Sequence, residues 1–141
     1  RHEAVHVGIS TQTDDGLMVP VIKHAEARDV WETANELVRV TSSAREKTAT
    51  IDELTGSTIT VTSLGAMGGL GATPIINHPE VSIVSIHAAR DRAVVRDGEV
   101  VVRKMMNVTS SFDHRIVDGY DGALLIQELK SMLEYPAKIF M

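Results

Sequence analysis

The sequence predicts an α+β fold in which helices pack on one face of a β-sheet. Six or seven segments have the short, β-branched or alternating pattern of strands, and most follow one another in runs. Only two segments have a sustained helical period, near residues 28–47 and after residue 122. Regular alternation of strand and helix, which would indicate a parallel α/β sheet, is absent from the pattern.

Length and composition limit the possible classes of protein. A chain of 141 residues with 43% hydrophobic and 23% charged residues fits one globular domain or part of one. No apolar run approaches the roughly 18 residues of a membrane span. The net charge of −5 and the lack of a basic face make nucleic acid a poor partner. The lack of cysteine excludes disulfides, thiolate metal sites and a cysteine nucleophile, and it favours a reducing compartment.

The first residues predict a hairpin. Residues 5–13 alternate between apolar and polar side chains, and Asp14-Asp15-Gly16 is a turn signal. Residues 17–22 have the pattern of a second strand, in which Pro20 cannot donate to a ladder and so belongs at an edge or bulge. The chain begins at Arg1 without a signal peptide, so we expect upstream residues to be missing from this sequence.

A helix is expected over residues 28–47. Asp29 is the candidate cap, and Trp31 beside the apolar stripe is expected to be a packing residue more than a ligand-stacking one. The stripe consists of Val30, Ala34, Leu37, Val38 and Thr41.

The middle of the chain predicts a short helical turn at 50–54 and a β-branched strand at 57–64. The glycines of residues 65–71 do not fit G-x-G-x-x-G, and the segment runs into two prolines instead of a helix. We therefore reject a dinucleotide site and expect a loop whose backbone approaches a ligand or another chain closely.

The C-terminal half predicts a central strand, a hairpin, a last strand and a helix. Residues 81–88 form an apolar run typical of a strand buried on both faces. Asp97-Gly98 is a hairpin turn between strands at 93–96 and 99–103, and residues 105–112 form the last strand. A helix follows Gly122 and ends before Pro136, and its apolar face consists of Leu125, Ile126, Leu129, Met132 and Leu133.

The turn at residues 110–119 is the strongest candidate for chemistry. A histidine has an ordinary pKa of about 6.5, which suits proton removal from a thiol with a pKa of about 8.5. His114 would be that base, although a histidine in a turn is more often solvated than catalytic. Asp118 could orient the imidazole, or it could pair with Arg115 or another arginine and hold the turn, which we weigh more heavily.

A donor for an oxyanion is available at the strand end Thr60-Val61-Thr62-Ser63, immediately before the glycine loop. Taken alone, these hydroxyls are ordinary strand residues. The remaining histidines do not have the spacing of metal ligands, and they are His2, His6, His24, His78 and His87.

Residues 113–119 resemble the D-H-R-x-x-D-G signature of the dihydrolipoyl acyltransferases, the core-forming components of 2-oxoacid dehydrogenase complexes. Residues 106–109 are most similar to the branched-chain type. Relative to the family, the sequence begins inside the catalytic domain, so residues 1–141 would be its C-terminal portion, without the lipoyl and peripheral-subunit-binding domains. Four further segments match in order and spacing, namely 16–22, 52–56, 73–77 and Pro136-Ala137.

The resemblance implies a chloramphenicol-acetyltransferase-like mixed sheet and a homotrimer with its active sites in channels between neighbouring subunits. His114 would take the proton from the attacking thiol. Thr62 would stabilise the tetrahedral oxyanion while facing His114 of the adjacent chain, and Asp118 would assist the base or hold the turn. Coenzyme A would lie beside Ser63, Ile86 and Ala88, with Gln12 and Thr41 as fainter contacts.

The implied activity is acyl transfer between the lipoyl thiol of dihydrolipoamide and coenzyme A by direct attack, without an acyl-enzyme. Trimers would assemble into a cubic or icosahedral cage, with the apolar tail at 139–141 as a contact between them. Implied partners are the lipoyl domain, the 2-oxoacid decarboxylase and dihydrolipoyl dehydrogenase, in the bacterial cytoplasm or the mitochondrial matrix. The alternatives are a free-standing chloramphenicol-type acetyltransferase and an inactive structural core.

Overall fold

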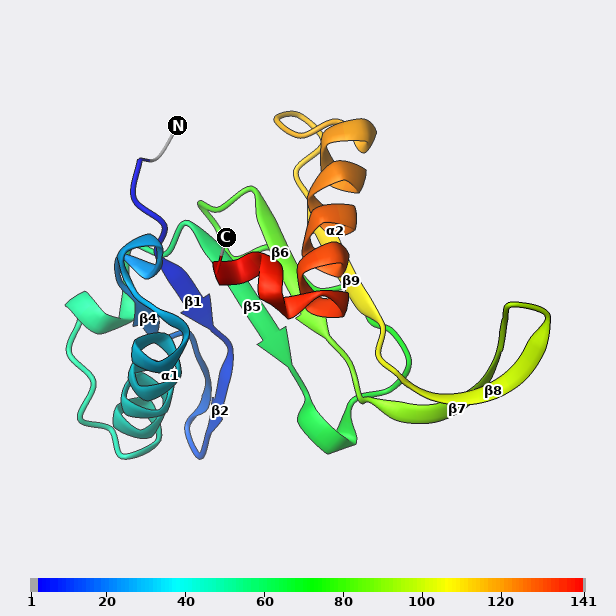
Figure 1. The fold of residues 1–141 in the computed structure, drawn as a ribbon. Coiled ribbons are helices and arrows are strands. Elements are labelled where there is room, and N and C mark those ends of the chain that lie inside the picture. Colours follow the sequence, from blue (N-terminus) through cyan, green and yellow to red (C-terminus); the bar gives the residue numbers. More distant parts are fainter. Residues whose placement is uncertain (1–2, 141) are drawn as a thin grey trace.

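A computed structural model describes residues 3–140, and it confirms the α+β class. Its main element is a five-stranded mixed sheet of order β4-β1-β5-β6-β9 (Figure 1). The central pairs β1–β5 and β5–β6 are parallel, whereas the two edge strands pair antiparallel. The strands are β1 (Val7–Ile9), β4 (Val21–Ile22), β5 (Ile59–Ser63), β6 (Ser82–Ile86) and β9 (Val108–Phe112).

The predicted N-terminal hairpin exists, but each of its strands is divided in two. β2 (Thr11–Thr13) pairs with β3 (Gly16–Met18) around the expected turn, where Gly16 has φ +117°. β1 and β4 form a separate pair in the main sheet. The expectation of two continuous strands was wrong. Pro20 has no N–H to donate to the ladder, which therefore breaks there, and only its carbonyl takes part by accepting the Ile9 N–H at 2.8 Å.

Helix α1 (Val30–Arg45) begins at Asp29 as expected. The Asp29 side chain accepts from the Glu32 N–H at 2.7 Å, and the Glu32 carboxylate accepts from the Asp29 N–H, which makes a complete capping box. The residues of α1 that are buried against β2 and β4 are Val40, Thr41 and Ala44.

Of the predicted stripe of α1, only Thr41 is buried. Val30, Ala34, Leu37 and Val38 are exposed in this chain, and Trp31 is 76% exposed, so it is not a packing residue here. Ala44 continues the stripe of Leu37 and Thr41 at helical spacing, so the buried residues all lie in the second half of the helix. The period alone does not say which part of the helix meets the sheet.

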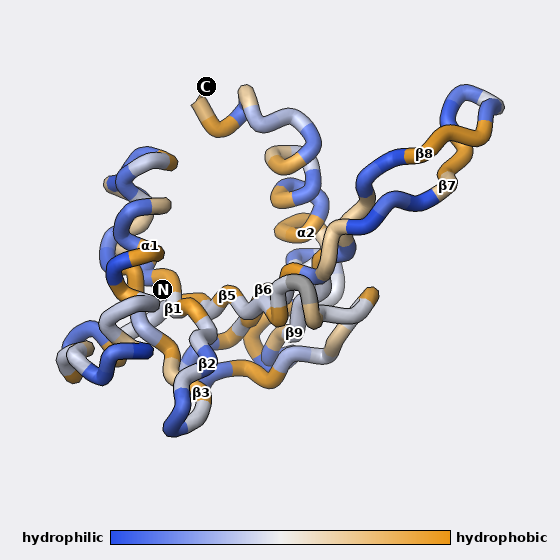
Figure 2. Tube along the Cα trace, turned by 90° about the horizontal axis from the view of Figure 1, so that it is seen from below, coloured by the Kyte–Doolittle hydropathy of each residue, from blue (hydrophilic) through white to orange (hydrophobic). Residues whose placement is uncertain are grey.

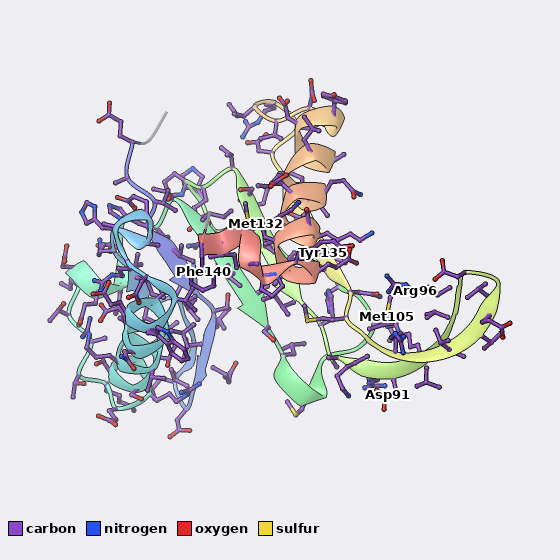
Figure 3. The ribbon with its side chains drawn as sticks, in the orientation of Figure 1. Asp91, Arg96, Met105, Met132, Tyr135 and Phe140 are labelled. Carbon is purple, nitrogen blue, oxygen red and sulfur yellow. The ribbon has the colours of Figure 1, made fainter. Side chains whose placement is uncertain are left out.

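The central strand β6 is buried on both faces from Ser82 to Ser85, as predicted. Before it, a 3₁₀ turn at Asp52–Leu54 and strand β5 lie where the sequence places them. The strands β7 (Arg90–Arg96) and β8 (Glu99–Met105) form a hairpin that projects from the body, and Figure 3 labels Asp91, Arg96 and Met105 on it.

The hairpin turn has Asp97 at φ +53° and Gly98 at φ +84°, as the Asp-Gly pair predicts. The last strand begins at Val108 and not at Met105, which belongs to β8. Asn107 ends the hairpin because its side chain donates to the Leu70 carbonyl and its own carbonyl accepts the His87 N–H at 3.2 Å.

Helix α2 (Gly119–Glu134) starts four residues before the expected position and ends before Pro136. It stands on the same side of the sheet as α1 (Figure 2), which confirms helices on one face. Gly122 is its only buried residue within the described part of the chain, while Leu125 and Leu133 are 44% and 50% exposed. Ile126, Leu129 and Met132 are half-buried.

The chain continues from α2 into a 3₁₀ turn (Pro136–Phe140). Phe140, labelled in Figure 3, is 74% exposed, and Met141 lies outside the described residues. Among residues 3–140, no helix is both long and apolar enough to cross a membrane.

Candidate active site

The His114 turn is anchored at its first residue. The Asp113 N–H donates to the Val81 carbonyl at 2.8 Å, and the Asp113 carbonyl accepts the N–H groups of Ile116 and Val117 at 2.9 Å. The Asp113 carboxylate also pairs with Arg115, with Nη2 2.6 Å from Oδ2 and Nε 2.9 Å from Oδ1. These hydrogen bonds from Arg115 lower the pKa of Asp113 to about 2.

Asp118 closes the same turn by capping α2. Its Oδ1 accepts the N–H groups of Tyr120 and Asp121, both at 2.9 Å. Arg115, which the sequence suggested as a partner for Asp118, is bound to Asp113 instead. Asp118 therefore holds the start of the helix through backbone contacts.

The His114 side chain lies between the end of β9 and the start of α2, and it is exposed. Within the described residues, no group is hydrogen-bonded to its imidazole, so both ring nitrogens are available to a substrate. The ring borders a cavity of about 500 Å³ whose walls include Ser110, Phe112, Val117 and Gln127. A neutral imidazole in such a position can accept a proton from a thiol.

The second group of predicted site residues gathers at the other end of the sheet. Parallel pairing places Thr62 beside Ser85 and Ser63 beside Ile86, and Ala88 follows two residues later. Thr62 is half-buried and Ser63 is exposed, and the Ser63 hydroxyl oxygen accepts the Gly65 N–H at 3.1 Å. Ser63 is thus a neighbour of Ile86, which lies more than 20 positions away in sequence, and Thr62 and Ala88 lie close to this pair along the chain.

Gln12 and Thr41 differ in what they can offer to a ligand. Gln12 is exposed on β2, which leaves the sheet at the Thr62 end because the adjoining Ser10 N–H donates to the Val61 carbonyl. Thr41 is 7% exposed, and its hydroxyl donates to the Leu37 carbonyl at 2.8 Å. Its side chain is therefore engaged inside α1.

The glycine loop makes one close backbone approach, and it is internal. A Cβ on Gly68 would lie 3.0 Å from the Gly65 carbonyl oxygen, whereas Cβ atoms on Gly65 and Gly71 would meet open space. The loop is joined to β9 through Thr109, whose hydroxyl donates to the Ala72 carbonyl at 2.9 Å.

His114 and Thr62 do not meet within one chain. Phe112 pairs with Ser82 at the start of β6, whereas Thr62 pairs with Ser85 three residues further along. Those three residues span about 10 Å of strand, and the chain runs two residues past Phe112 before it reaches His114. β5 and β9 run in opposite directions beside β6, so they end at opposite ends of the sheet (Figure 1).

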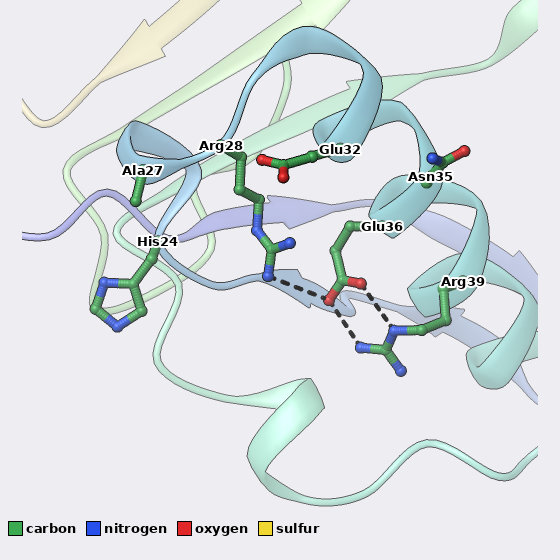
Figure 4. A pocket seen from close by; sticks show the side chains of 7 residues that line it. All are labelled: His24, Ala27, Arg28, Glu32, Asn35, Glu36 and Arg39. Atoms are coloured by element: carbon green, nitrogen blue, oxygen red, sulfur yellow. Dashed lines mark hydrogen bonds and ion pairs between the residues drawn. The ribbon is translucent and has the colours of Figure 1, made fainter.

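A second cavity, of about 520 Å³, lies between α1 and the loop before it (Figure 4). Its charged groups neutralise one another, since Glu36 Oε1 lies 2.8 Å from Arg39 Nη2 and 3.8 Å from Arg28 Nη2. Hydrogen bonding from Arg39 lowers the pKa of Glu36. The cluster fixes the helix to its loop, and sequence analysis did not find it because the ion pairs depend on the fold.

The whole chain, residues 1–141, matches the family described as 2-oxoacid dehydrogenases acyltransferase (catalytic domain). The chain belongs to this family. It is 57% identical over all 141 residues to the lipoamide acyltransferase component of the branched-chain α-keto acid dehydrogenase complex of Pseudomonas putida. It is 38% identical over 136 residues to the dihydrolipoyllysine-residue acetyltransferase of the Staphylococcus aureus pyruvate dehydrogenase complex. The chain spans about a third of the length of these relatives, 33% and 32%.

Solved acyltransferase structures have the same fold. Dihydrolipoamide acetyltransferase of Azotobacter vinelandii superposes with a TM-score of 0.94 at 34% identity, over all of this chain and 58% of that one. The truncated catalytic core of the Thermoplasma acidophilum 2-oxoacid dehydrogenase complex superposes with a TM-score of 0.82 at 37% identity, over 96% of this chain and 59% of that one. The family match confirms the resemblance that residues 113–119 carry.

Proposed function

We propose that residues 1–141 are the C-terminal portion of a dihydrolipoyl acyltransferase core, which moves an acyl group between the lipoyl thiol and coenzyme A. The observation that carries the proposal is the D-H-R-x-x-D-G turn, which presents His114 with a free imidazole at the edge of a cavity. Identities of 57% and 55% to branched-chain acyltransferases, against 38% to pyruvate-complex acetyltransferases, favour a branched-chain complex.

In this mechanism His114 takes the proton of the attacking thiol, and the sulfur forms a bond to the thioester carbonyl carbon. The Thr62 hydroxyl donates to the oxyanion of the tetrahedral intermediate. Its collapse breaks the original carbon–sulfur bond, and the departing sulfur receives the proton from the His114 imidazolium. The reaction needs no acyl-enzyme, and coenzyme A as substrate would lie along Ser63, Ile86, Ala88 and Gln12.

Support for these roles comes from the Azotobacter relative, which was studied for the parts that a serine, a histidine and an asparagine have in its mechanism. Its serine and asparagine stand at the same sequence distances from its histidine as Thr62 and Asp118 do from His114. Threonine can replace serine as a hydroxyl donor, and aspartate and asparagine are equally good helix caps.

We further infer that the site forms between copies of the chain. Because His114 and Thr62 lie at opposite ends of one sheet, a neighbouring copy has to bring its Thr62 to His114. A homotrimer provides three such sites by symmetry. A relative that superposes with a TM-score of 0.94 is the cubic core of a pyruvate dehydrogenase complex, which supports a cage. The exposed residues Ile139 and Phe140 would join trimers in it.

The remaining partners follow from the same proposal. A lipoyl domain would deliver the acyl group, the 2-oxoacid decarboxylase would load it, and dihydrolipoyl dehydrogenase would reoxidise the dihydrolipoyl group. The relatives from Pseudomonas and Staphylococcus are bacterial, which favours the bacterial cytoplasm over the mitochondrial matrix.

The test is an acyl-transfer assay of the full-length protein with dihydrolipoamide and a panel of acetyl, isobutyryl and succinyl coenzyme A. We expect transfer to dihydrolipoamide, fastest with isobutyryl. Acetylation of chloramphenicol without transfer to dihydrolipoamide would overturn the proposal. Solution mass tests the assembly, because a monomer at micromolar concentration contradicts the shared site, whereas a bare trimer contradicts only the contact at the tail.

A further inference from the structure

Glu80 is a buried carboxylate that the mechanism does not use. It is 8% exposed and lies just before β6. Its Oε1 accepts three hydrogen bonds, from Ser57 Oγ at 2.5 Å, Thr60 Oγ1 at 2.7 Å and Asn77 Nδ2 at 3.0 Å. Burying a carboxylate is costly unless such bonds satisfy it. We call these four residues the Glu80 cluster.

The cluster holds the strand that carries the oxyanion donor. Thr60 is fully buried, and its side chain points to the same face of β5 as that of Thr62, two residues later. The fit around Thr60 is tight, because a Cβ on Gly8 of β1 would lie 2.8 Å from Thr60 Oγ1. Glu80 thus fixes the position of β5 at the last inward-facing residue before Thr62.

The same residue holds the anchor of the His114 turn. The Glu80 N–H donates to the Asn77 carbonyl at 2.9 Å, so backbone and side chain both bind Asn77. The next residue, Val81, offers the carbonyl that accepts the Asp113 N–H at 2.8 Å. Movement of Glu80 would therefore move the attachment point of the turn.

We propose that Glu80 is a positioning residue for both halves of the active site, a role that rests on the shared site proposed above. It touches neither substrate, and it acts through Thr60 on Thr62 and through Val81 on His114. Among the described residues, no group is hydrogen-bonded to Oε2, so all three side-chain bonds depend on one oxygen. Glutamine retains an oxygen acceptor in that place, whereas alanine removes it.

Hybrid assemblies of the full-length protein separate the two effects. A mixture of H114A and T62A chains, with Glu80 intact, is the reference, because each restored site takes His114 from one chain and Thr62 from the other. In the first hybrid, E80A is added to the T62A chain and tests the His114 half. In the second, E80A is added to the H114A chain and tests the Thr62 half.

We expect kcat to fall about tenfold or more in each hybrid, since small displacements of catalytic groups cost that much or more. The KM for coenzyme A should change less than about twofold, and E80Q in place of E80A should restore kcat to within about threefold. V40A, at a fully buried site on α1, is the control with a comparable loss of Tm and no link to the cluster.

An unchanged kcat in either hybrid overturns the proposal, as does an equal loss of kcat with V40A at equal Tm. Equal losses with E80Q and E80A also overturn it, because the retained acceptor oxygen would then have no effect. An inactive reference mixture, by contrast, would contradict the shared site itself and with it the role of Glu80.

Discussion

The two ends of β6 carry the two halves of the candidate site, and they are built by different kinds of contact. At the start of β6, the His114 turn is held mainly by short-range bonds, from Arg115 to Asp113 and from the first turn of α2 to Asp118. At its end, Thr62 and Ser63 are placed opposite Ser85 and Ile86 by parallel strand pairing. The base is placed largely by local sequence, whereas the oxyanion donor depends on the assembled sheet.

The largest effect on activity should come from the His114 turn, which local contacts hold in place. H114A removes the general base, so we expect acyl transfer by the full-length protein to fall about a hundredfold or more. The matched control is H24A, an exposed histidine beside α1 that should leave kcat unchanged. Near-normal turnover by H114A would show that the turn does no chemistry.

Removing the donor at the other end should cost nearly as much. We expect T62A to lose about a hundredfold in kcat through the oxyanion, and T62S to stay within about tenfold of the parent. Mixing H114A with T62A chains should restore about a quarter of the parent activity, because in a random symmetric trimer one site in four has both groups. If the mixture stays inactive, the two ends do not serve a common site.

A smaller effect is expected at Asp118, and it distinguishes a cap from a partner of the imidazole. D118A should lower the free energy of unfolding by about 1 kcal/mol through the lost cap. D118N should keep both backbone hydrogen bonds and therefore the stability and most of the activity. The measurements are denaturant unfolding and kcat, and an equal loss of activity in both variants would contradict the capping role.

The smallest expected effect is on thermal stability at low pH. Arg115 lowers the pKa of Asp113 in the folded chain from 3.8 to about 2. The ion pair therefore stabilises the fold fully when the pH is above the pKa of Asp113 in the unfolded chain. That contribution is lost as the pH falls through the folded value. The Tm of the parent should therefore fall more steeply than that of D113N between about pH 5 and pH 2. Parallel curves would show that the pair adds no stability to the turn.

Much of this fold could be predicted because its signals are local. The Asp29 capping box, the Asp97-Gly98 turn and the buried run around β6 each depend on a few consecutive residues. The His114 turn belongs to the same class, since its signature and its helix cap are contiguous. The sequence by itself determined these elements, because backbone preferences and side-chain caps act over one or two turns.

Only the tertiary structure decided which surfaces meet. Packing on the sheet buried Val40 and Ala44 in the second half of α1 and left Trp31 near its start exposed, which the helical period alone does not indicate. Strand register placed Thr62 and His114 at opposite ends of β6, and it brought Glu80 against Thr60. Contacts of this kind join residues about 20 or more positions apart, so no local pattern records them. They are settled by which strands pair and in what register.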